Sequence, residues 1–272
     1  MKTVSVSMTF SVSSERRISS ETAKGHLSIV KTMYKWAYKM HLIELLPRNL
    51  VDLTKISTNG NSEPKVLTFT LKELGILWKK GVPRHRCFML LALNCGMGQQ
   101  DISDLRMDEV DWENGYIERE RSKTKVKTKH KLWSVTLELM KEFRHAGSSG
   151  NDRVFLTQIR QQEKYTGEAA EHKPLVRNVI RDGRLTRSDC IKNICWRLRQ
   201  KTGINDGRGF YCLRKTGASL IERIDPQATE MYLSHSEKGM KKNYAHRDWG
   251  RLDAALDEMW EQVKSVLVKD EK

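Results

Sequence analysis

Residues 119–131 read RERSKTKVKTKHK, and every odd position in this stretch is Arg or Lys. A period of two is typical of a β-strand, because successive side chains of a strand point to opposite faces of the sheet. The stretch therefore predicts a β-ribbon with a turn near residues 125–128. Wherever the alternation continues through that turn, the basic side chains share one face. Seven like charges on one face need a source of negative charge.

The composition of the whole chain indicates what that source is. The 272 residues include 49 Lys and Arg against 34 Asp and Glu, so the formal net charge is +15. Such an excess points to a polyanion, which is either nucleic acid or an acidic membrane surface. No run of about 18 apolar residues occurs, which argues against a membrane span. We therefore interpret the ribbon as a DNA-binding element that acts through Arg119, Arg121, Lys125, Lys127 and Lys129.

Further features of the composition limit the class of protein. With 38% apolar and 31% charged residues, the chain has the balance of a globular protein. Its N-terminus lacks the continuous apolar segment of a secretory signal. Its five cysteines show no paired or metal-ligand spacing. We expect a cytoplasmic, nucleoid-associated protein with free thiols, no metal ion and no other cofactor.

Outside the ribbon, most of the chain shows the apolar period that is typical of helices. Thr70 and Glu73 have the spacing of a capping box at the start of one of them. The polar stretch 147–185 is expected to be a long irregular loop. The predicted fold class is mainly α with a small antiparallel β-sheet or hairpin (α+β). Helices are expected at about residues 20–40, 70–80, 86–95, 99–105, 134–145, 187–201, 213–223 and 249–267.

Residues 57–64 have the Ser-, Asn- and Gly-rich composition of a linker. They predict a helical domain at 1–58, a linker at 59–64 and a second domain at 65–272. The helix expected at 20–40 carries basic residues within an arc of about 80°. Either these residues form the solvated face of a core helix or they lie on a phosphate backbone. They are Lys24, Lys31, Lys35 and Lys39.

Polar residues follow one another in a set order through the second domain. Lys123 lies in the ribbon, and Arg214 ends the stretch YCLR. His235 lies in YLSHS, and Tyr244 follows nine positions later. In this order and spacing the chain resembles the catalytic domain of the tyrosine recombinases, the phage integrase family. The resemblance covers about residues 65–250, and it implies a catalytic domain preceded by a short helical core-binding domain that clamps DNA.

Several positions depart from the family pattern. Residues 94–105 (NCGMGQQDISDL) align with the family's Gly-x-Arg-x-x-Glu-Leu run. Asp101 then matches the acidic position, and Gly98 stands where the first catalytic arginine belongs. Tyr211 replaces the histidine of His-x-x-Arg, and Ser234 replaces the glycine before the later histidine. Gly96 and Gly98 also mark a turn that needs a positive φ or a close approach of the backbone.

The resemblance implies cleavage and rejoining of double-stranded DNA through a 3′-phosphotyrosyl intermediate. Tyr244 is then the nucleophile, and Lys123 protonates the leaving 5′-oxygen. The phosphate oxygens are bound by Arg214, His235 and Tyr211. The resemblance also implies a homotetramer on DNA, without a membrane or a small-molecule cofactor.

The missing arginine leaves more than one function open. The chain is either an active recombinase with an altered site or a degenerate relative that binds DNA without cutting it. A basic membrane-surface or RNA-binding protein is a weaker alternative, against which the ordered polar residues argue. The apolar stripe of the last helix packs either on a neighbouring protomer or on its own domain.

Overall fold

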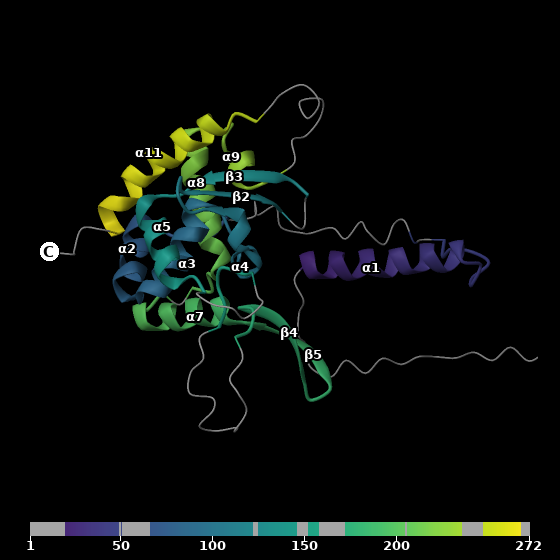
Figure 1. The fold of residues 1–272 in the computed structure, drawn as a ribbon. Helices are drawn as coiled ribbons and strands as arrows, with labels where there is room; N and C mark the ends of the chain where they lie inside the picture. Colours follow the sequence, from purple (N-terminus) through teal and green to yellow (C-terminus); the bar gives the residue numbers. More distant parts are fainter. Residues whose placement is uncertain are drawn as a thin grey trace, which may run out of the picture. The chain divides into compact units, whose positions relative to one another are not determined.

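The computed structural model divides the chain into two compact units, residues 1–65 and 66–272, which are described separately (Figure 1). Lys123 and Tyr244 lie outside the described residues. The structure describes residues 20–48, 50, 66–121, 125–145, 152–157, 172–204, 206–235 and 247–267.

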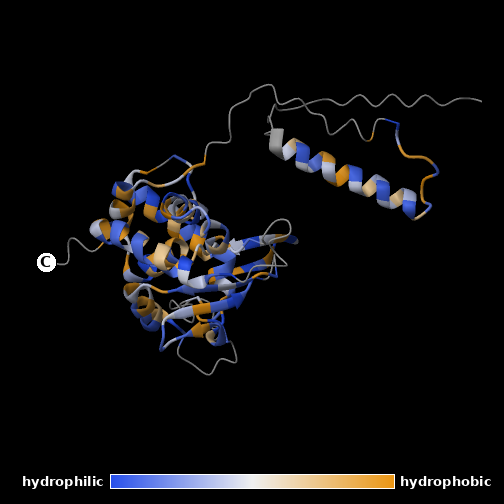
Figure 2. Cartoon of the chain, turned by 90° about the horizontal axis from the view of Figure 1, so that it is seen from above, coloured by the Kyte–Doolittle hydropathy of each residue, from blue (hydrophilic) through white to orange (hydrophobic). Residues whose placement is uncertain are grey.

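The described part of the first unit contains helix α1 (Ser20–Lys39), as the sequence predicts. Large apolar side chains on this helix remain exposed, among them Ile29 at 68%, Met33 at 55% and Trp36 at 55%. The view coloured by hydropathy shows hydrophobic and hydrophilic residues interspersed along the coloured part of this helix (Figure 2). A complete core-binding domain in this unit therefore stays a prediction.

The core of the second unit is built around helix α3 (Pro83–Asn94), whose residues from Cys87 onward are all buried. Pro83 occupies the first turn, where its missing N–H breaks no helical hydrogen bond, and this start lies three residues before the predicted one. The capping box of α2 is confirmed, since Glu73 Oε2 accepts from the Thr70 backbone N–H at 2.8 Å. The other helices are α2 (Leu71–Lys80), α4 (Gln99–Asp104), η2 (Met107–Glu109), α5 (Ser134–Phe143), α7 (Cys190–Thr202), α8 (Tyr211–Ile224) and α9 (Thr229–Tyr232).

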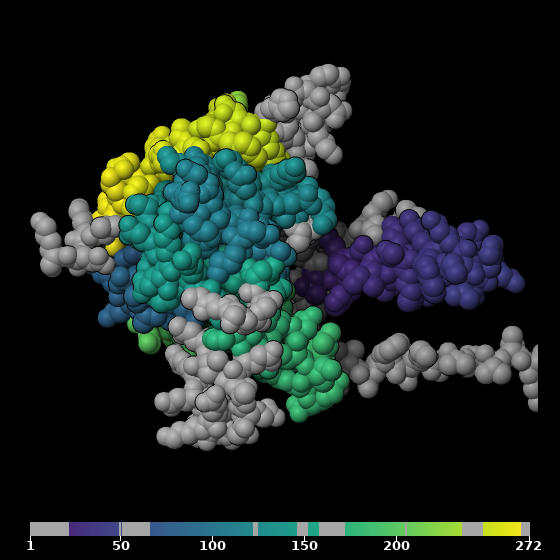
Figure 3. All heavy atoms as spheres, in the orientation of Figure 1, coloured from purple at the N-terminus to yellow at the C-terminus, as the bar shows by residue number. Residues whose placement is uncertain are grey.

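The C-terminal helix α11 (Trp249–Leu267) lies along the surface of the second unit (Figure 3). Leu252, Leu256, Met259 and Val263 are fully buried, and the helix contacts α2, α8 and β3. The apolar stripe therefore packs on its own unit, and its packing on a neighbouring protomer stays a prediction.

The basic ribbon forms a three-stranded sheet of β1 (Val110–Asp111), β2 (Tyr116–Glu120) and β3 (Lys127–Lys131). The ribbon is confirmed, but its turn lies before residue 127, earlier than expected. Arg119 pairs with Thr128, and Glu118 pairs with Lys129. Odd positions of β2 therefore face the same way as even positions of β3. The basic residues of the two strands do not share one face, because the alternation does not continue through the turn: Arg119 points inward, and the lysines of β3 point outward.

A second hairpin, β4 (Val176–Arg181) with β5 (Arg184–Asp189), occupies the end of the stretch predicted as an irregular loop. That prediction is wrong for these residues. The turn is Asp182-Gly183, with φ of 49° and 71°, and Asp-Gly with both φ values positive is the preferred two-residue hairpin turn. The hairpin extends from the body of the unit (Figure 3). Its last residue, Asp189, caps α7 by accepting from the Lys192 backbone N–H at 2.8 Å.

Candidate active site

Arg214 is held at the centre of the site by groups from three separate elements. It lies in the first turn of α8 and its side chain is only 3% exposed. One terminal nitrogen donates to the Gly96 carbonyl, and Nη2 donates to the Leu233 carbonyl at 2.6 Å. The same guanidinium lies 4.0 Å from Asp101 Oδ2. Because hydrogen bonds to charged groups are strong and directional, these contacts hold the guanidinium in one orientation.

Burial lowers the pKa of Arg214 from its ordinary value, and the nearby positive charge of Arg121 lowers it further. An arginine nonetheless keeps its proton in a protein. The site therefore contains a buried, permanent positive charge that is not fully neutralised by the single carboxylate beside it.

Asp101 connects the start of α4 to this charge. Its Oδ2 accepts from the Gly98 backbone N–H at 3.0 Å, so the side chain caps its own helix. Its Oδ1 lies 3.7 Å from Arg121 Nε, and its backbone carbonyl accepts from Arg119 Nη1 at 2.7 Å. The acidic position of the family pattern is thus the point where α4, β2 and α8 meet.

The turn between α3 and α4 leaves room at the position of the missing arginine. Gly98 has an extended backbone with φ of −85°, so the positive φ expected of this turn does not lie at this residue. A Cβ there would lie 3.4 Å from Asp101 Oδ2 and 3.9 Å from the Tyr211 ring, which are ordinary contacts. The positive φ of this turn belongs to Gly96, at 57°, where a Cβ would press on Tyr232. The tight approach therefore occurs two residues before the vacant position.

Tyr211 and His235 flank Arg214 at the surface. The Tyr211 residue is 47% exposed, and its ring centroid lies 6.0 Å from the Arg214 guanidinium carbon. His235 Nδ1 lies 2.9 Å from Glu230 Oε2, a contact that orients the ring. Both residues line an open groove of about 540 Å³ together with Arg214. The structure thus brings these three predicted residues together, and Lys123 and Tyr244 lie outside the described residues.

Arg247 supplies a connection that the sequence analysis missed. Its Nη2 donates to the His235 carbonyl at 2.7 Å, and its Nη1 donates to the Lys127 carbonyl at 3.1 Å. The segment that precedes α11 is thereby joined to the histidine segment and to strand β3. Its role depends on contacts between segments far apart in sequence, so no local pattern could have found it.

The register of the β2–β3 hairpin places the basic residues that are predicted to contact DNA on opposite sides of the hairpin. Lys129 lies 2.5 Å from Glu118 Oε1, and Lys125 lies 3.8 Å from Glu120 Oε1. Arg119 Nε lies 3.5 Å from Glu109 Oε1 on the inner side. Carboxylates of the chain therefore supply part of the negative charge that the sequence analysis assigned to DNA. Contacts of these residues and of the α1 lysines with DNA stay predictions.

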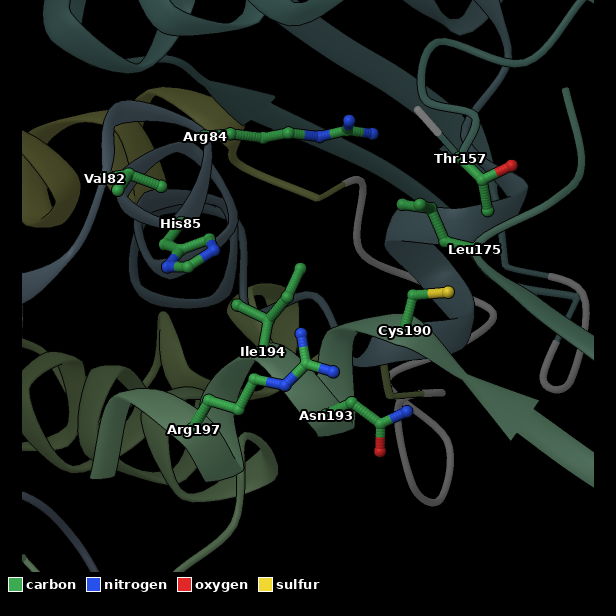
Figure 4. A pocket seen from close by; sticks show the side chains of 9 residues that line it. All are labelled: Val82, Arg84, His85, Thr157, Leu175, Cys190, Asn193, Ile194 and Arg197. Atoms are coloured by element: carbon green, nitrogen blue, oxygen red, sulfur yellow. The ribbon is translucent and has the colours of Figure 1, made fainter. Parts of the chain in front are cut away.

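A separate cavity of about 390 Å³ shares no lining residue with this site (Figure 4). Arg84 and His85 of α3 approach it from one side, and Asn193 and Arg197 of α7 from the other. Arg84 donates to the Leu156 carbonyl. In the described ranges no cluster of His, Cys, Asp and Glu has the placement of a metal site, and no described helix is long and apolar enough to cross a membrane.

Comparisons with known proteins establish the family and the fold of the chain. The model of the phage integrase family matches residues 69–251, so the chain belongs to the phage integrase family. The family and the mainly helical fold with small antiparallel sheets, both predicted from sequence, are confirmed. A search of curated proteins found no match.

Solved structures of integrases share the fold at low sequence identity. A lambda integrase dimer bound to a COC′ core site is 17% identical with a TM-score of 0.55, over 84% of this chain and 77% of that chain. The Tn1549 transposon integrase in complex with a circular intermediate DNA is 16% identical with a TM-score of 0.53, over 90% and 81%. A lambda integrase tetramer bound to a Holliday junction is 17% identical with a TM-score of 0.54, over 84% and 61%. The chain thus spans less than two thirds of the longer lambda integrase chain.

Proposed function

We propose that this chain is a site-specific tyrosine recombinase that cleaves and rejoins double-stranded DNA through a 3′-phosphotyrosyl intermediate. The observation that carries the proposal is the buried Arg214 guanidinium, held beside Tyr211 and His235 at an open groove. A fixed positive charge at the wall of a groove suits a phosphate whose negative charge increases in the transition state.

The proposed reaction conserves the energy of the phosphodiester. The Tyr244 hydroxyl gives up its proton to water, and its oxygen forms a bond to phosphorus while the bond from phosphorus to the 5′-oxygen breaks. Lys123 gives the leaving 5′-oxygen its proton. Arg214 binds the non-bridging oxygens, and His235 and Tyr211 donate hydrogen bonds to them. The reverse attack by a 5′-hydroxyl of another strand releases Tyr244 and joins the DNA.

The same proposal covers the partners of the chain. The lysines of α1 and the outward-facing lysines of the β2–β3 hairpin bind the phosphate backbone, which is consistent with the net charge of +15. The DNA-bound dimer and tetramer among the similar structures support a homotetramer on DNA. The protein then acts in the cytoplasm, on the nucleoid.

The second candidate function is a DNA-binding protein that does not cut. Gly98 favours it, because no side chain projects from the position of the first arginine. Loss of a transition-state arginine lowers phosphoryl-transfer rates by about 10³–10⁵. The two candidates make opposite predictions about covalent chemistry and the same prediction about binding.

A search for covalent adducts separates the two. Nicked duplexes made from the DNA that borders the coding region are incubated with the full chain, and the products are resolved under denaturing conditions. The recombinase proposal expects a protein–DNA adduct that disappears in Tyr244→Phe and persists in Tyr116→Phe, a control outside the site. Specific DNA binding without any adduct, unchanged in Tyr244→Phe, would establish the non-cutting alternative.

A further inference from the structure

Arg121 follows strand β2 directly, and its side chain turns to the inner side of the hairpin. Only 16% of that side chain is exposed, whereas the lysines of β3 lie on the outer side. Its backbone N–H donates to the Val126 carbonyl at 3.0 Å, which holds the residue at the mouth of the hairpin turn. The register of β2 thus aims this arginine at the start of α4 rather than at solvent.

Arg121 and Arg214 share their partners. Arg121 Nη1 donates to the Leu233 carbonyl at 3.4 Å, and Arg214 Nη2 donates to the same oxygen at 2.6 Å. Arg121 Nε lies 3.7 Å from one Asp101 oxygen, and Arg214 lies 4.0 Å from the other. Two guanidinium groups from separate elements therefore converge on one carboxylate and one carbonyl.

The charges of this cluster do not balance. Three guanidinium groups, those of Arg119, Arg121 and Arg214, line one small cleft with Asp101. Arg119 has Glu109 as its own ion-pair partner at 3.5 Å. Asp101 is left as the one described carboxylate that is paired with both Arg121 and Arg214. Like charges that are partly withdrawn from water repel strongly, so the pair retains an excess positive charge that an anion would neutralise.

Gly98, which stands at the position of the missing first arginine, lies next to the same Asp101 carboxylate. A side chain at residue 98 would begin 3.4 Å from Asp101 Oδ2, on the carboxylate whose other oxygen faces Arg121. An arginine reaching this point from α4 and one reaching it from β2 both place a guanidinium next to Arg214. The chain lacks the first and possesses the second.

We propose that Arg121 is a catalytic residue that takes the place of the missing first arginine and binds a non-bridging oxygen of the scissile phosphate beside Arg214. The proposal rests on the recombinase function proposed above. It deepens that function, because it explains how a site with glycine at position 98 keeps two cationic groups for the phosphate.

The first test uses inorganic phosphate as the probe and needs no cleavage. Ligand binding to the folded state raises Tm, and 50 mM phosphate at a Kd of order 10 mM gives a rise of roughly 3 °C over chloride of equal ionic strength. We expect this rise in the wild type and in Arg106→Ala, a control arginine that is ion-paired with Asp108 and Asp152. In Arg121→Gln, which keeps a hydrogen-bonding side chain, the rise should fall by more than half. An unchanged rise in Arg121→Gln, or no rise in the wild type, overturns the proposal.

The second test measures adduct formation with the nicked duplexes. Loss of one donor to the transition-state oxyanion lowers rates by about 10²–10³, and we expect this loss in Arg121→Gln with less than a threefold change in DNA affinity. Gly98→Arg in the Arg121→Gln background should raise the rate of adduct formation at least tenfold, because a Cβ at residue 98 meets only ordinary contacts.

The outcomes separate the two proposals. A wild type that forms adducts while Arg121→Gln forms them equally fast leaves the recombinase function intact and overturns the role of Arg121. A wild type that binds phosphate through Arg121 but forms no adduct overturns cleavage and with it the catalytic role of Arg121, and leaves only an anion-binding site at this residue.

Discussion

The second unit contains two basic antiparallel hairpins, and they use their charges differently. Hairpin β2–β3 is connected to the site: its inner side carries Arg119 and Arg121, and its outer lysines have carboxylate neighbours such as Glu118. In hairpin β4–β5, no ion pair with a carboxylate is found among the described residues for Arg177, Arg181, Arg184 and Arg187.

The difference shows that the density of basic residues in a sequence does not identify the surface available to a polyanion. In β2–β3 the carboxylates of the chain already neutralise much of the charge, so fewer counterions remain to be released on binding. Hairpin β4–β5 also exposes two large apolar side chains, Ile180 at 76% and Leu185 at 72%. The arginines of β4–β5 have no ion-paired carboxylate among the described residues, so more of their positive charge is left unneutralised than that of the β3 lysines.

The largest expected effect comes from neutralising hairpin β4–β5. Replacing its four arginines by Gln should reduce the magnitude of the negative slope of log K against log salt by about 3–4. Each neutralised phosphate contributes about 0.9 to that magnitude. Affinity for duplex DNA at 0.1 M salt then falls by up to about 10³-fold. Fluorescence anisotropy at several salt concentrations gives the slope directly.

The matched control for that measurement replaces the lysines on the outer side and the turn of hairpin β2–β3. Changing Lys125, Lys127, Lys129 and Lys131 to Gln should lower the slope by only about 1, because three of these lysines already have carboxylate partners. The reverse ranking would restore the β2–β3 ribbon as the main DNA surface.

Protonation of His130, on the inner side of β3, should make the stability of the protein depend on pH. Burial lowers the pKa of His130 to about 4, against an opposing hydrogen bond with the Tyr232 carbonyl. The unfolded chain binds this proton more readily, so the stability conferred by neutral His130 is present above pH 6.5 and is lost as the pH falls through 4. The loss amounts to roughly 3 kcal/mol. Urea midpoints between pH 7.5 and 4.5 should fall less in His130→Gln than in the wild type, and equal falls would assign the effect to other groups.

The smallest expected effect concerns the turn that supplies the carbonyl shared by Arg121 and Arg214. Ser234 follows Leu233 and has a φ of 55°, a conformation that strains any side chain with a Cβ. Ser234→Gly should therefore stabilise the protein by about 0.5–1 kcal/mol, which raises Tm by about 2–3 °C for a domain of this size. Ser188→Gly, in extended strand β5, should lower Tm instead. A fall in Tm for Ser234→Gly would show that the contacts of the serine side chain outweigh the strain.

Much of the fold follows from local patterns. Apolar periodicity locates α1, α2 and α11, and the spacing of Thr70 and Glu73 places the start of α2, because these features depend on residues within a few turns of one another. The β4–β5 hairpin was missed although Asp182-Gly183 is a strong turn pattern. The long polar context of residues 147–185 outweighed two short strands whose side chains are largely exposed.

In the candidate site, too, some features follow from the sequence and others only from the tertiary structure. The order of Arg214, His235 and Tyr244 is a property of the sequence, and it was sufficient to identify the family. The partners of those residues do not follow from the sequence: Arg247 reaches the His235 carbonyl across 12 positions, and Arg214 reaches the Leu233 carbonyl across 19.

The sequence by itself determined the charge of the protein, the helical periods, the family resemblance and the glycine at position 98. Only the tertiary structure decided which basic residues face the site and which face solvent. A change of one residue in hairpin register moves every side chain of a strand to the other face. That register placed Arg121 beside Arg214 and Asp101 and turned the lysines of β3 outward. The strands of this hairpin pack against η2, α9 and α11, and a local sequence pattern does not contain those contacts.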